Sequence, residues 1–242
     1  MRGFTHALTA AAAAAAIATY GWHQTPALAA TTAVIALGAG TEPDVDQPGS
    51  CIARAFGPIT EALARTVRRL AGGHREGTHT AAGNAISAGL AAIAIALESW
   101  HPHVHLNGVT VSAPVGRVLL GAYLALLFAA GMGAVRRPRR TSRRWAIAVG
   151  ASTAIAVTGW DAAGIAWAIF VGAAIHCAGD ALTKDGDPWL EPFTSHRFHL
   201  LPPPLRITTG HAVERCLIAP AAIAALTWMA YLILIAPHLA SR

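Results

Sequence analysis

Charged side chains and cysteines are both scarce in this sequence. Only 12% of its 242 residues are Asp, Glu, Lys or Arg, against about 25% in an average soluble domain. The three cysteines, Cys51, Cys177 and Cys216, are odd in number and show no paired spacing. This pattern argues against a disulfide scaffold and against a zinc module built from thiolates. The cysteines are therefore expected to be small buried side chains.

Signature motifs of several common enzyme classes are also missing. The chain has no GxxxxGK[ST] phosphate loop, no GxGxxG after a strand and no GxSxG. Nucleotide hydrolysis, dinucleotide-dependent redox chemistry and serine-hydrolase chemistry therefore lack their usual sequence support. The glycines are instead spread through apolar segments, as in closely packed membrane helices.

Apolar residues are abundant, at 54% of the chain, and alanine supplies many of them. We expect an all-α fold: a polytopic membrane bundle of six to seven short hydrophobic helices, forming one domain over residues 1–242. A soluble, alanine-rich helical core is the alternative. Several segments are shorter than the ~20 residues that a perpendicular crossing needs, and shallow interfacial hairpins stay open. The predicted segments are 7–19, 27–39, 81–97, 118–135, 145–159, 162–178 and 216–236.

Basic residues are distributed unevenly between these segments. If each segment crosses once and the N-terminus is cytoplasmic, the cytoplasmic pieces are 1–6, 40–80, 136–144 and 179–215. These pieces hold every Lys and Arg except Arg117 and Arg242. Because positive charge marks cytoplasmic loops, this orientation is expected. It explains the pI of about 10.0 more simply than nucleic-acid binding does.

The N-terminus permits a competing interpretation. Met1 and Arg2, followed by an alanine-rich run and the Pro26–Ala29 stretch, are similar to a signal peptide with an Ala-x-Ala cleavage site. Cleavage would remove His6 and invert the orientation, and would place most basic residues outside. We therefore favour an uncleaved first helix.

The strongest chemical signal is the pair His176 and Asp180 at the end of an apolar segment. Four residues apart on a helix, they share one face and can bind one cation. Ionisable residues at such positions are functional candidates by default. Thr183 follows, where it can hydrogen-bond Asp180 or cap the helix.

Two further polar segments fall on the same predicted face of the membrane. Asp44 and Asp46 lie in a glycine- and proline-rich turn, a pattern that suits divalent cations. His74 and His79 are five apart, about 140° from each other on a continuous helix. Both can therefore contribute only if the chain breaks near Gly77, with Thr78 or Thr80 capping the next helix.

Other histidines and acids are weaker candidates. The alternating histidines of residues 101–105 fall on the opposite side of the membrane and have only Glu98 as a nearby carboxylate, so adventitious metal binding or a plain polar loop is favoured there. His211 and Glu214, three residues apart at the start of the last segment, are second-tier ligands or general bases. Asp46 and Thr183 belong to the same second tier.

The ordered set of these motifs resembles the YdjM-type family of inner-membrane-associated, metal-dependent hydrolases. The resemblance covers residues 5 to about 215, and it also includes Glu191–Thr194 and Thr209-Gly210. A more distant similarity is to the zinc-dependent phospholipases C and related nucleases, whose additional ligands, including the amino-terminal group, have no counterpart identified in this sequence. The metal ligands that the resemblance implies are His6, Asp44, His74, His79, His176 and Asp180.

The resulting hypothesis is a multi-pass inner-membrane hydrolase with its N-terminus and metal site facing the cytoplasm. Its cofactor would be a divalent metal, with zinc favoured and manganese or magnesium as alternatives. Asp44 would orient a metal-activated water, and Arg75 would offset charge on a phosphoester, either a small molecule or lipid-linked. Membrane lipids are expected partners, and a protein partner stays open. The alternative is a non-catalytic membrane protein with a structural metal site and basic loops that dock a cytoplasmic partner or anionic lipid.

Overall fold

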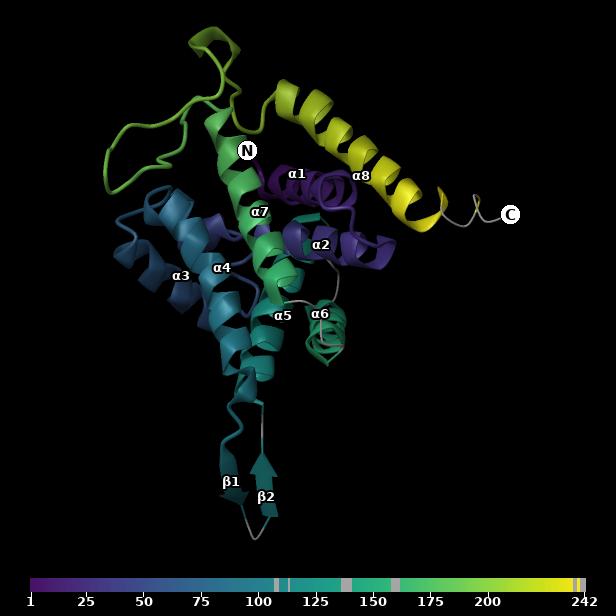
Figure 1. Cartoon of the computed structure of the whole chain (residues 1–242). Helices are drawn as coiled ribbons and strands as arrows, with labels where there is room; N and C mark the ends of the chain where they lie inside the picture. Colours follow the sequence, from purple (N-terminus) through teal and green to yellow (C-terminus); the bar gives the residue numbers. More distant parts are fainter. Residues whose placement is uncertain (107–108, 113, 136–140, 158–161, 237–238, 240–242) are drawn as a thin grey trace.

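Helices account for nearly all the regular structure of the protein. The structure is a computed structural model that describes residues 1–106, 109–112, 114–135, 141–157, 162–236 and 239. Within these residues the chain forms eight α-helices and one antiparallel hairpin (Figure 1). The helices are α1 (Gly3–Ala16), α2 (Pro26–Ala39), α3 (Pro58–Leu70), α4 (Ala81–Ala96), α5 (Val115–Val135), α6 (Thr141–Val157), α7 (Ala162–Ala181) and α8 (Ala219–Leu234). The strands are β1 (His103–Leu106) and β2 (Val109–Ser112).

The seven predicted apolar segments all form helices, which confirms the all-α fold. Four helical stretches in the described part of the chain are long and apolar enough to cross a membrane: Ala81–Ser99, Val115–Val135, Ala163–Ala181 and Glu214–Leu234. The other three predicted segments form α1, α2 and α6, of 14, 14 and 17 residues. Helices α1 and α2 lie across α7 rather than along it (Figure 1). Four of the seven predicted segments are thus candidate spans within the described residues.

Two elements were not expected from the sequence. Helix α3 lies within residues 40–80, which were predicted to be a loop. A search for apolar segments does not detect this helix, because it contains three arginines. The β-hairpin carries the alternating histidines, and His103 and His105 are exposed on it. The hairpin projects from the C-terminal end of α4 and the N-terminal end of α5, away from the N-terminus of the chain (Figure 1). Residues 136–140 of the predicted arginine-rich loop lie outside the described residues.

Small residues allow the helices to pack closely, as membrane helices do. A Cβ atom added to Gly38 of α2 would lie 2.4 Å from the carbonyl oxygen of Leu127 in α5. One added to Gly172 of α7 would lie 2.6 Å from the Cβ of Ala39. Helix α2 therefore packs so closely against α5 and α7 that no side chain fits at these two glycines. This packing holds the C-terminal end of α2 in the centre of the bundle.

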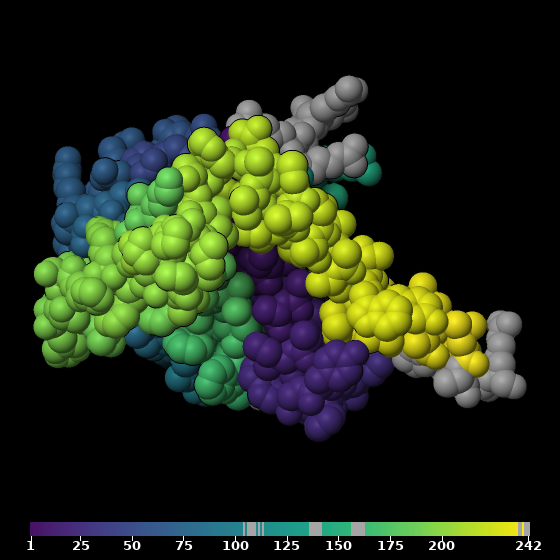
Figure 2. All heavy atoms as spheres, turned by 90° about the horizontal axis from the view of Figure 1, so that it is seen from above, coloured from purple at the N-terminus to yellow at the C-terminus, as the bar shows by residue number. Residues whose placement is uncertain are grey.

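The N-terminal end of α4 and the C-terminal end of α7 meet at the end of the molecule opposite the hairpin. The segment between α7 and α8 spreads over this end, as seen from above in Figure 2. The Ala81 amide donates to the Trp189 carbonyl at 2.9 Å, and the Lys184 amide donates to the Ile207 carbonyl at 3.0 Å. These hydrogen bonds join the start of α4 and the end of α7 to the segment between α7 and α8.

Candidate metal centre

The last two turns of α7 carry the histidine–aspartate pair. His176 and Asp180 are 0% and 1% exposed. His176 Nδ1 lies 2.8 Å from the Gly40 carbonyl oxygen. Because a carbonyl only accepts, Nδ1 donates, and Nε2 is left to face the cluster. No described residue offers this buried Nε2 a hydrogen bond.

Asp44 lies on a 3₁₀ turn, Pro43–Asp46, that follows α2. The turn is fixed by Glu42, whose carboxylate accepts hydrogen bonds from the Ser87 hydroxyl of α4 and the Tyr123 hydroxyl of α5. Burial raises the pKa of the Asp44 carboxyl above its usual value.

Asp46 organises the chain from His74 to His79. Its carboxylate lies 2.8 Å from His74 Nδ1 and accepts from the Arg75 amide at 3.1 Å and from the Thr78 hydroxyl at 2.8 Å. Because the Thr78 proton points to Asp46, the Thr78 oxygen accepts from His79 Nδ1 at 3.1 Å. His79 Nε2, which is buried and lacks a hydrogen-bond partner, therefore faces the cluster.

Helix α4 begins just after His79. Thr80 caps this helix, since its hydroxyl accepts from the Gly83 amide at 2.9 Å, and this confirms one of the two predicted caps. The chain takes positive φ values at Gly72, Gly73 and Arg75, and a short 3₁₀ turn, Gly77–His79, follows. Arg75, at φ 60°, is held in a conformation that side chains rarely adopt.

Four donor groups converge from three segments of the chain. His79 Nε2 lies 3.9 Å from Asp44 Oδ1 and 3.8 Å from Asp180 Oδ2. His176 Nε2 lies 3.8 Å from Asp44 Oδ1 and 3.7 Å from Asp180 Oδ2. Ligands around one tetrahedral zinc ion are separated by roughly 3.3–3.6 Å. Asp44, His79 and His176 form one group whose donor atoms are close enough together to hold a cation, and Asp180 Oδ2 lies beside both histidines.

The second oxygen of Asp180 faces the N-terminus. Asp180 Oδ1 contacts the Met1 amino group and lies 3.2 Å from His6 Nε2. The His6 ring stacks on His176 with ring centres 3.7 Å apart. Burial, followed by the neighbouring His176, lowers the pKa of His6 to about 3, so this imidazole is neutral. His6, His176 and Asp180 form a second group whose donor atoms are close enough to hold a cation.

Asp187 joins the cluster although the sequence analysis did not assign it a role. Its backbone is fixed by hydrogen bonds in both directions with Phe198, and its side chain is 0% exposed. Within the described residues no hydrogen bond of normal geometry reaches its carboxylate, although the Cys177 and Trp189 side chains lie close enough to act on its pKa. His79, Asp180 and Asp187 form a third group with the spacing of metal ligands. Burial, and then the Asp180 charge, raises the pKa of Asp187 to about 8.

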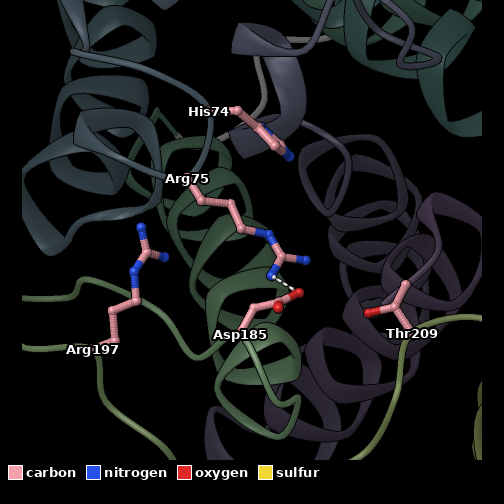
Figure 3. A pocket seen from close by; sticks show the side chains of 5 residues that line it. All are labelled: His74, Arg75, Asp185, Arg197 and Thr209. Carbon is pink, nitrogen blue, oxygen red and sulfur yellow. Dashed lines mark hydrogen bonds and ion pairs between the residues drawn. The ribbon is translucent and has the colours of Figure 1, made fainter.

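A pocket of about 460 Å³ opens beside the cluster, lined by His74, Arg75, Asp185, Arg197 and Thr209 (Figure 3). Arg75 bridges the pocket and the cluster, because one guanidinium nitrogen lies 3.0 Å from Asp180 Oδ2 and the other 3.0 Å from Asp185 Oδ2. Arg197 is held 2.9 Å from Glu76. Two cationic side chains therefore face a cavity next to the candidate ligands.

The family model for the YdjM inner membrane protein matches residues 1–241. The chain belongs to the YdjM inner membrane protein family. No curated protein and no solved structure matches. The chain is therefore a YdjM-family inner membrane protein whose described residues include four candidate spans and a buried His/Asp cluster compatible with a metal ion.

The second-tier residues predicted for this YdjM-family chain support the cluster from outside. The Thr183 hydroxyl donates to the Asp180 carbonyl at 2.7 Å. Glu214 accepts from the Arg2 amide, the Thr5 hydroxyl and the Gly210 amide, at 2.6–2.7 Å. Glu214 thus ties the start of α1 to the start of α8. His211 is exposed.

Asp187 had a weak local signal in the sequence. It follows Gly186, whose φ of 66° turns the chain back toward α7. An Asp-Gly-Asp run is common in solvated turns, so its spacing alone does not indicate a ligand. Its burial depends on the pairing with Phe198, eleven residues later, and that pairing is not readable from local sequence.

Proposed function

We propose that this protein is a metal-dependent hydrolase that cleaves a phosphoester at the membrane surface. The observation that carries the proposal is the pair of buried, unpartnered Nε2 atoms of His79 and His176. Each lies within 4 Å of the carboxylates of Asp44 and Asp180. Buried polar atoms normally have partners, so this arrangement suggests that a cation is the missing partner.

The residues present suit a divalent cation. Two imidazoles and two carboxylates are a common zinc donor set, and neutral histidines are the form that binds metal. Burial lowers the pKa of His79 well below its usual value, which keeps that imidazole available. Asp187 forms a further group of this kind with His79 and Asp180, and we include it among the ligands. This oxygen-rich set keeps manganese and magnesium as alternatives to zinc.

The roles of the side chains follow from their exposure. A bound divalent cation would supply an activated water by lowering its pKa toward ~7. Asp44 is 21% exposed while the other four proposed ligands are buried, so it is the carboxylate best placed to orient that water and accept its proton. Arg75 reaches from the ligand Asp180 into the pocket, where its guanidinium suits a phosphate oxygen. Displacement of Asp185 from Arg75 would admit the substrate anion.

The setting favours an amphiphilic substrate. The pocket lies at the end of two candidate spans, α4 and α7, so a lipid-linked phosphoester could reach it from the bilayer. The uneven distribution of basic residues supports a cytoplasmic location for this end. Small soluble phosphoesters remain the simplest probes.

The test is hydrolysis by the full chain in lipid nanodiscs. A chromogenic phosphodiester and a short-chain phospholipid would each be assayed after chelation and after return of zinc or manganese. We expect activity that requires metal, and a loss of roughly 10²–10³-fold in kcat/KM for Arg75→Gln. Arg117→Gln is the control, because Arg117 pairs with Glu98 near the hairpin.

Three outcomes separate the alternatives. Metal-dependent activity that Arg75→Gln removes supports the proposal. Tight metal binding without hydrolysis of either probe class supports the structural-site alternative. Hydrolysis that survives complete chelation contradicts the proposed chemistry.

A further inference from the structure

Helix α3 exposes an apolar face that no described part of the chain covers. Ile59, Leu63 and Leu70 are 77%, 46% and 84% exposed. Their spacing of four and seven residues places them on one side of the helix. The buried residues of α3, Thr60 and Ala64, lie on a different side. The helix therefore has one face packed against the protein and a separate apolar face without a partner.

Crossing a membrane does not explain this face. A helix of 13 residues spans about 20 Å, less than the ~30 Å of hydrocarbon. It also carries Glu61, Arg65, Arg68 and Arg69. A short, strongly amphipathic helix with arginines on its polar side is typical of helices that lie in the plane of the membrane interface.

The arginines of α3 indicate that its partner is a negatively charged surface. Arg65 and Arg69 are exposed and lie away from the apolar face, and Arg68 donates to the Gln47 side chain at 3.0 Å. We propose that α3 lies in the headgroup layer of one leaflet, with Ile59, Leu63 and Leu70 in the acyl region and its arginines on anionic lipid phosphates. Long arginine side chains can reach the phosphates while their stems cover apolar surface.

The position of α3 links this contact to the cluster. Helix α3 packs against the Pro43–Asp46 turn, which carries Asp44. Anionic lipid would therefore be concentrated beside the helix that packs on the Asp44 turn. The inference concerns lipid contact alone and does not depend on hydrolysis.

A fluorescent label on either side of α3 tests the proposal. Leu63→Cys labels the apolar face and Arg65→Cys the polar side, each in the full chain with the three native cysteines replaced. The proteins would be placed in nanodiscs whose lipids carry brominated acyl chains, either phosphatidylcholine alone or a mixture with phosphatidylglycerol. We expect quenching at position 63 to exceed that at position 65 by roughly twofold or more, and to be larger with phosphatidylglycerol.

Three results of the quenching experiment would contradict the proposal. Quenching of the Leu63→Cys label by aqueous iodide rather than by lipid would overturn the proposal. Protection from both quenchers would assign the face to a second protein chain and would also overturn it. Equal lipid quenching in both compositions would overturn the assignment to anionic lipid. Arg69→Gln in the Leu63→Cys background is expected to reduce the difference between the two compositions.

Discussion

Single hydrogen bonds decide which atom each central histidine offers to the cluster. The Gly40 carbonyl fixes Nδ1 of His176. The hydroxyl of Thr78, itself oriented by Asp46, fixes Nδ1 of His79. Both Nε2 atoms therefore face the carboxylates before any cation arrives. Such supporting contacts typically determine metal affinity as much as the ligands do.

The Thr78→Val substitution tests this support. It removes the link between Asp46 and His79 while nearly preserving side-chain shape. We expect metal affinity to fall by roughly 10-fold, measured by competition with a chelating indicator. Thr227→Val, at an exposed hydroxyl on α8 that bonds only the Ile223 carbonyl, is the matched control. Unchanged affinity in Thr78→Val would show that His79 is not oriented in this way.

The Asp187→Asn substitution tests the ligand that the sequence analysis missed. Because no described residue gives the buried Asp187 carboxylate a hydrogen bond of normal geometry, loss of the carboxylate should weaken metal binding by roughly 10–100-fold. The fold should remain, since the amide is neutral and of the same shape. Asp185→Asn, two residues away and exposed, should leave metal affinity unchanged. Equal affinities in the two variants would remove Asp187 from the ligand set.

At the scale of elements, sequence predicted the helices better than their connections. Apolar composition located seven of the eight helices, and helical spacing paired His176 with Asp180. Helix α3 was missed because its hydrophobic residues recur along one face of an otherwise charged segment. The pairing of Asp187 with Phe198 and the reversal at Arg75 depend on contacts between distant segments. Local sequence does not encode such contacts.

Because α2 is closely packed, substitution by alanine should affect the stability of the fold very differently at two glycines. Gly38→Ala would place a methyl group against the Leu127 backbone of α5, and we expect it to destabilise the fold by about 1–3 kcal/mol. Gly89→Ala on α4 meets nothing within 4 Å and should leave stability unchanged or slightly raised. Thermal unfolding in detergent measures both. Equal Tm values would contradict tight contact between α2 and α5.

The whole molecule has two chemically different ends. The C-terminal end of α7, which carries His176 and Asp180, lies at one end, and the β-hairpin lies at the other (Figure 1). The positive-charge count that suggested the orientation assumed seven crossings, and four candidate spans are found among the described residues. The cytoplasmic assignment of the metal centre therefore stays a prediction.

Two exposed serines at opposite ends test the orientation. A membrane-impermeant maleimide should label Ser112→Cys, on the hairpin, in intact spheroplasts. It should label Ser195→Cys, in the segment after α7, only after lysis. The opposite pattern would place the candidate metal centre outside the cytoplasm. Labelling of both in intact cells would mean that the two ends lie on one side.

Metal content tests the central claim most directly. Elemental analysis would compare the detergent-purified wild type with His176→Ala and Asp44→Ala, purified without chelators. We expect roughly stoichiometric zinc or manganese in the wild type, and its loss from both variants while their helical content is retained. A folded wild type that contains no metal and takes up none on titration would contradict the metal centre. The cluster would then be a polar network that joins α1, α4 and α7.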